Sequence, residues 1–122
     1  MLAEFTKVRQ VPGDGFRRWF TDSTFDLIIW YKDDSLEEVL GFQLCYDKEG
    51  GQRAVTWYRE KGFYHNRIDD GEASPFKNRT PILVADGSFP KERVLRSFRD
   101  AARRLDHSLV TFVVDTIERY PT

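Results

Sequence analysis

Apolar positions recur along the chain with two different periods, and the period changes near residue 90. Before that point, apolar and polar residues alternate in short runs rich in aromatic and β-branched side chains, which is typical of half-buried strands. The connections between the runs are short, and short connections join antiparallel neighbours because a parallel pair needs a long crossover. The pattern predicts a five-stranded antiparallel β-meander over residues 16–70, with strands near 16–21, 25–32, 39–46, 53–60 and 63–70.

After residue 90 the period becomes helical. Pro90 opens a segment with no Gly or Pro before Pro121, and its first apolar stripe ends at Leu105. A second stripe, over residues 109–120, is rotated relative to the first, and N-cap residues such as Asp106 and Ser108 stand between them. We therefore expect one kinked helix or two consecutive helices over residues 90–120, packed on the sheet in an α+β fold.

The chain of 122 residues has the size of one domain, and we predict a single α+β domain over residues 1–122. Residues 1–15 are expected to form an N-terminal arm and turn. Residues 71–89, which contain Pro75 and Pro81, are expected to form a loop, with an optional short edge strand at 82–85.

Composition narrows the class of protein. Hydrophobic residues at 40% and aromatic residues at 15% exclude a disordered chain. The net charge of −1 provides no global field for a polyanion, so no nucleic-acid partner is expected. Cys45 is the one cysteine and cannot form an internal disulfide, which fits a reducing compartment. The chain has no apolar run of membrane-spanning length and no signal-peptide pattern, so we expect a cytoplasmic protein without a membrane contact.

The apolar pattern also predicts how the strands pair. Placing Leu27 opposite Leu44 and Ile29 opposite Phe42 gives one continuous apolar face. The hairpin between 39–46 and 53–60 fits this face in either of two registers. The last hairpin is expected to turn at Lys61-Gly62, which would place Val55 opposite Ile68.

The opposite face then carries the candidate site, because its inner strands bear small or uncharged side chains with larger groups at the sides. Five residues are predicted to line a shallow trough there: Trp30, Gln43, Tyr58, His65 and Arg67. Trp30 and Tyr58 offer stacking surfaces, and Arg67 offers a forked donor for a carboxylate or phosphate. Gly41, Ala54 and Thr56 would form the floor. A second interpretation stays open, in which the helices cover this face and Trp30 shields the backbone at Gly41.

These features predict a binding or interaction domain that holds a small anionic or aromatic ligand, or a peptide, on one sheet face. The alternative is a small enzyme in which His65 works with Asp69, Asp26 or Glu60 as an acid–base pair. The sequence assigns no catalytic residue, no metal site and no cofactor. A small molecule or a protein is the expected partner, and a homodimer through the C-terminal helix is one expected assembly.

Overall fold

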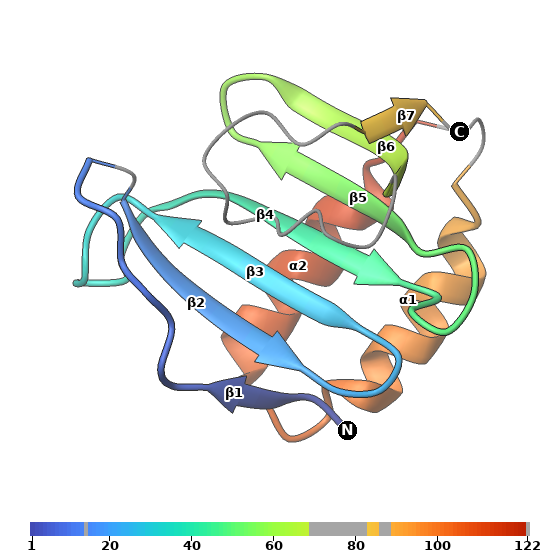
Figure 1. The fold of residues 1–122 in the computed structure, drawn as a ribbon, viewed down its shortest axis with the longest axis horizontal. Helices are drawn as coiled ribbons and strands as arrows, with labels where there is room; N and C mark the ends of the chain where they lie inside the picture. Colours follow the sequence, from blue (N-terminus) through green and yellow to red (C-terminus); the bar gives the residue numbers. More distant parts are fainter. Residues whose placement is uncertain (14, 69–82, 86–88, 122) are drawn as a thin grey trace.

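The computed structural model describes residues 1–13, 15–68, 83–85 and 89–121, and it has two layers (Figure 1). One layer is an antiparallel sheet of seven strands in sequence order, and the other consists of two helices packed on one face of that sheet. The elements are β1 (Ala3–Phe5), β2 (Phe16–Thr21), β3 (Asp26–Tyr31), β4 (Val39–Tyr46), β5 (Arg53–Tyr58), β6 (Gly62–Ile68), β7 (Leu83–Ala85), α1 (Lys91–Ala101) and α2 (His107–Glu118). The predicted α+β meander followed by C-terminal helices is confirmed; β7 corresponds to the optional edge strand expected at 82–85, and β1 is an additional edge strand.

The expected N-terminal arm contains an edge strand. In β1, Ala3 lies opposite Thr21 of β2. Two contacts hold the start of the chain: the backbone N–H of Leu2 donates to the carbonyl of Ala101 at 2.8 Å, and the N-terminal ammonium lies 3.3 Å from Asp22. Leu2 is 2% exposed, so its burial against the helical layer fixes the position of β1.

The core fills the space between the sheet and the helices. Phe25 of the β2–β3 turn meets Phe98 of α1 edge to face, with ring centroids 5.9 Å apart, and Phe42 of β4 meets Phe112 of α2 at 6.3 Å. The apolar stripe of α2, represented by the buried Val113 and Ile117, is used inside this core.

Pairing in the first two central hairpins follows the apolar pattern. Leu27 lies opposite Leu44 and Ile29 opposite Phe42, as predicted. A bulge between Trp30 and Tyr31 then places Tyr31 opposite Val39. Leu44 lies opposite Val55, which is one of the two registers that the sequence left open.

The register predicted for the last hairpin is wrong. Val55 lies opposite His65, not opposite Ile68. The turn is longer than expected, because the backbone N–H of Lys61 donates to the carbonyl of Tyr58 at 3.1 Å and Gly62 follows at φ +88°. A tight turn followed by a left-handed glycine is the usual three-residue hairpin connection. The shift is an odd number of residues, so every β6 side chain moves to the other sheet face.

Candidate functional site

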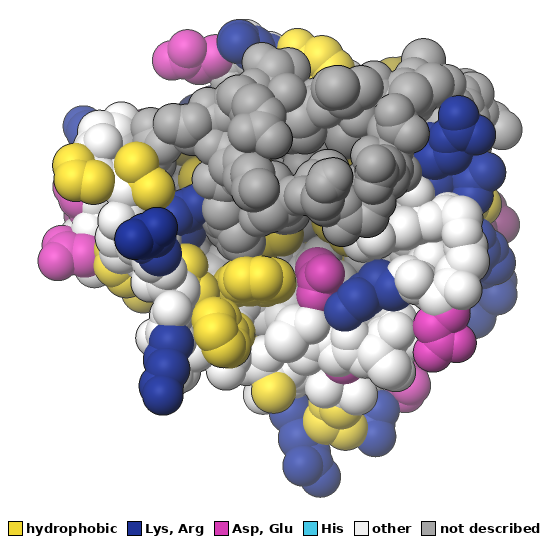
Figure 2. Space-filling model, viewed as in Figure 1, with side chains coloured by type: hydrophobic (Ala, Val, Ile, Leu, Met, Phe, Trp, Pro, Cys, Tyr) yellow, Lys and Arg dark blue, Asp and Glu magenta, His cyan; other side chains and the backbone are white. Residues whose placement is uncertain are grey.

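The sheet face that points away from the helices is organised in cross-strand rows. One row consists of Phe5, Trp19, Ile28, Gln43, Thr56 and Tyr64, and its neighbour of Arg17, Trp30, Gly41, Tyr58 and Gly62. Figure 2 views the molecule from this side, and hydrophobic side chains reach the surface there. Side chains within one row, and in neighbouring rows on the same face, lie close enough to form a common surface.

Three aromatic side chains from β3, β5 and β6 form a continuous group, here called the aromatic strip: Trp30, Tyr58 and Tyr64. The ring centroids are 5.9 Å apart for Trp30 and Tyr58 and 6.0 Å apart for Tyr58 and Tyr64. Tyr58 is 38% exposed and Tyr64 is 43% exposed, while Trp30 is half-buried. Burial raises the pKa of the Tyr58 phenol, so its hydroxyl stays protonated at neutral pH and can donate a hydrogen bond.

Gly41 is the reason that two of these rings can meet. It lies on β4 between Trp30 and Tyr58. A Cβ atom at this position would stand 2.5 Å from the carbonyl oxygen of Trp57 and 3.1 Å from Cδ1 of Tyr58. The lack of a side chain therefore lets the Tyr58 ring lie close to the β4 backbone, as expected for an aromatic group that shields a strand glycine.

The centre of the face is buried and its polar groups are used internally. Gln43 is 4% exposed, Thr56 is 2% exposed and Cys45 is 1% exposed. The amide oxygen of Gln43 accepts a hydrogen bond from Thr56 at 3.2 Å, and its amide nitrogen donates to the Cys45 sulfur at 3.3 Å. Gln43 is on the predicted face, but its hydrogen bonds are made within the protein.

The other two predicted site residues lie on the helix side of the sheet, because of the register of β6. His65 is 7% exposed, and its Nε2 lies 2.5 Å from the hydroxyl of Tyr46. Its ring also contacts Phe89, with centroids 5.2 Å apart. Arg67 is exposed and lies opposite Arg53. The five predicted residues are thus divided between two faces, with Trp30, Gln43 and Tyr58 on one of them and His65 and Arg67 on the other.

The sequence interpretation missed Tyr64, which takes the place on the face that had been given to β6 residues of the other parity. The signal was present in the turn: a two-residue hairpin favours Asn-Gly or Asp-Gly, and this chain has Lys61-Gly62. A glycine at the end of a longer turn would have put Tyr64 beside Tyr58.

The residues suggested for acid–base chemistry are not brought together where the structure describes them. Asp26 lies on the face opposite to His65, where it accepts a hydrogen bond from Thr21 at 2.6 Å and pairs with Lys48 at 3.0 Å. Glu60 is exposed in the β5–β6 turn, and Asp69 falls outside the described residues. Burial raises the pKa of Cys45 to about 12, so this thiol is protonated at neutral pH.

Two arginines near the helices form ion pairs. Arg93 of α1 binds Asp47 through two nitrogens at 3.1 and 2.9 Å, and Arg103 binds Asp100 at 3.0 Å. Among the residues that the structure describes, no group of three His, Cys, Asp or Glu side chains could hold a metal ion. None of the described helices is long and apolar enough to cross a membrane.

Comparison with known proteins gives no match: no protein-family model, no curated protein and no solved structure is significantly similar to this chain.

Proposed function

We propose that this protein is a binding domain without catalytic activity, and that it captures a peptide segment of a partner protein on the aromatic strip. The observation that carries the proposal is the continuity of Trp30, Tyr58 and Tyr64 across three strands, with two rings more than a third exposed. Single exposed aromatics are common on protein surfaces, whereas a contiguous group is typical of interaction sites. Tyr and Trp are also the residues that most often dominate binding free energy at interfaces.

The chemistry of the strip favours a peptide that presents aromatic or proline side chains. Exposed ring faces stack on planar or compact apolar groups, and the two tyrosine hydroxyls can donate hydrogen bonds to peptide carbonyls. An anionic ligand is less well supported than the sequence alone indicated. Arg67 and His65 lie on the other face, and Arg17, which shares a row with Trp30, is 4% exposed and donates to the Arg9 carbonyl.

The test uses a phage-displayed library of random peptides, selected against the intact protein. Enriched peptides should contain aromatic or proline residues and should bind the wild type in calorimetry. The Tyr58→Ala and Tyr64→Ala variants should each weaken that binding by about tenfold or more, since interface anchors cost at least 1–2 kcal/mol on truncation. Both positions are exposed, so the fold should persist.

Phe5→Ala is the matched control. Phe5 and Tyr64 are both 43% exposed and stand at opposite ends of the same cross-strand row. Five strand spacings of about 4.8 Å separate them, which is roughly 24 Å. Binding should be unchanged in Phe5→Ala. Failure to enrich any peptide, or equal losses in Phe5→Ala and Tyr64→Ala, would contradict the proposed function.

A further inference from the structure

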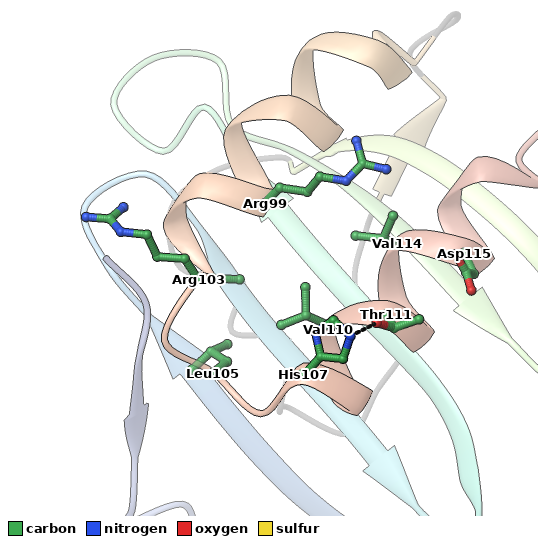
Figure 3. A pocket seen from close by; sticks show the side chains of 9 residues that line it. Arg99, Arg103, Leu105, His107, Val110, Thr111, Val114 and Asp115 are labelled. Carbon is green, nitrogen blue, oxygen red and sulfur yellow. Dashed lines mark hydrogen bonds between the residues drawn. The ribbon is translucent and has the colours of Figure 1, made fainter.

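A cleft lies between α1 and α2, on the opposite side of the molecule's helical layer from the core (Figure 3). Its volume is about 420 Å³, which is near the lower end of the range for small-molecule sites. The floor is aliphatic and is formed by Leu105, Val110 and Val114; Ala102 also borders the cleft but is 0% exposed. Leu105 belongs to the connection between the helices, so the cleft is closed where they join and suits a compact ligand better than a long helix.

The charged groups around the cleft are mostly basic. Arg99 and Arg103 line it as permanent cations, and Asp115 is the acidic residue among its lining groups. In Figure 3, the side chain of Arg99 extends from α1 toward α2, above Val114, whereas the guanidinium of Arg103 points away from the other labelled side chains. Arg99 is therefore the cation best placed to meet a ligand lying on the aliphatic floor.

Arg99 is paired with Glu118, and the carboxylate of a ligand can replace Glu118 in this ion pair. Arg99 donates to the Glu118 carboxylate at 3.1 Å, and the two side chains are 53% and 52% exposed. An ion pair exposed on both sides contributes little to stability, so a competing carboxylate loses little free energy by displacing Glu118. A ligand that also buries apolar surface in the cleft gains a contribution that Glu118 cannot supply.

We propose that this cleft binds a short amphiphilic carboxylate, with its aliphatic chain on the floor formed by Leu105, Val110 and Val114 and its carboxylate on Arg99. The site is separate from the aromatic strip, because the helices and the strip lie on opposite sides of the sheet (Figure 1). The two proposals therefore stand or fall independently.

The test is a titration with octanoate, below its micelle concentration, followed by the ¹³C methyl signals of Leu105, Val110 and Val114. These signals should shift and saturate. Arg99→Gln should weaken octanoate binding by up to about fivefold, because the Arg99 side chain is 53% exposed and an exposed ion pair contributes about 0.2–1 kcal/mol. Arg96→Gln is the matched control, because Arg96 is an exposed arginine of α1 that does not line the cleft. It should bind octanoate as the wild type does.

A neutral probe separates the two parts of the proposal. Octanol should bind the wild type and Arg99→Gln with equal affinity, because it has no carboxylate for Arg99 to hold. Val110→Phe, which places a bulky aromatic ring in the cleft at a half-buried position, should weaken the binding of both probes while the protein stays folded. Methyl signals that do not move at millimolar octanoate, or equal octanoate affinity in Arg99→Gln and the wild type, would overturn the proposal.

Discussion

The hydroxyl of Tyr46 and Nε2 of His65 are 2.5 Å apart, and the two rings stack with an angle of 10° between their planes. Tyr46 is 1% exposed and His65 is 7% exposed, so this hydrogen bond lies inside the layer between the sheet and the helices. Phe89 contacts both rings, with centroids 5.8 Å from Tyr46 and 5.2 Å from His65. A buried polar pair stabilises a fold while both members stay bonded, and it is costly when one is removed.

Tyr46→Phe should therefore destabilise the protein. Removing the hydroxyl takes away the Tyr46–His65 hydrogen bond in a buried place, and the expected loss is about 1–3 kcal/mol of unfolding free energy. Urea unfolding measures it. Tyr58→Phe is the control: it removes a tyrosine hydroxyl at an exposed position and should change the unfolding free energy by less than about 0.5 kcal/mol. Equal effects of the two substitutions would show that the buried bond contributes nothing.

Gly41→Ala should also be destabilising, because the new Cβ would stand 2.5 Å from the Trp57 carbonyl oxygen, a backbone atom that cannot simply turn aside. Overpacking of this kind typically costs about 1–3 kcal/mol. Gly50→Ala is the control, since nothing lies within 4 Å of a Cβ there. The midpoint of urea unfolding should fall for Gly41→Ala and stay near the wild-type value for Gly50→Ala. The reverse order would be inconsistent with Tyr58 packing over β4.

Trp30→Ala separates the two interpretations of its sheet face. The helices lie on the other face, and Trp30 is half-buried and packs against the Tyr58 ring. We expect a loss of roughly 1–2 kcal/mol, from that ring pair and partial burial. Phe42→Ala, at a position that is 0% exposed in the core, should cost about 3–5 kcal/mol. A Trp30→Ala loss as large as that of Phe42→Ala would show that Trp30 belongs to a closed core.

The Cys45 thiol should make the free energy of unfolding depend on pH in the alkaline range. Burial raises its pKa from 9.0 to about 12, so the folded state keeps a proton that the unfolded state loses. The resulting contribution is fully present below about pH 9 and disappears as the pH rises toward 12. The difference in unfolding free energy between the wild type and Cys45→Ala should fall by up to about 1.4 kcal/mol per pH unit above pH 9. If the unfolding free energies of the wild type and Cys45→Ala change in parallel with pH, the Cys45 pKa is not raised by folding.

The central strands could be predicted from the sequence because one pairing alone gives a continuous apolar face. Leu27 and Leu44, and likewise Ile29 and Phe42, pair as that argument requires. The position of β6 could not be predicted in this way. Its register depends on whether Gly62 lies within a two-residue turn or follows a longer one, and the two possibilities expose opposite faces of the strand. In the observed register, His65 lies in the core and Tyr64 lies beside Tyr58.

Two of the three residues of the aromatic strip could be predicted by the same reasoning. Trp30 and Tyr58 flank Gly41 on a common face, and this follows from the registers of the inner strands. The burial of Gln43 could not be read from the pattern, because small and polar side chains at the centre of a sheet face are compatible with an open floor or with a packed one. Only the three-dimensional structure shows its amide bonded to Thr56 and Cys45.

The most direct test of the central claim uses the three indole N–H signals of the protein in a ¹⁵N-labelled sample. Trp30 belongs to the aromatic strip, Trp57 packs against Phe112 of α2 on the helix side, and Trp19 lies on the same face as Trp30, on the neighbouring strand β2. Addition of a selected peptide should shift the Trp30 signal, with saturation at the calorimetric affinity, and leave the Trp57 signal on the helix side in place. A Trp30 signal that does not move while the peptide binds would contradict the assignment of the binding surface.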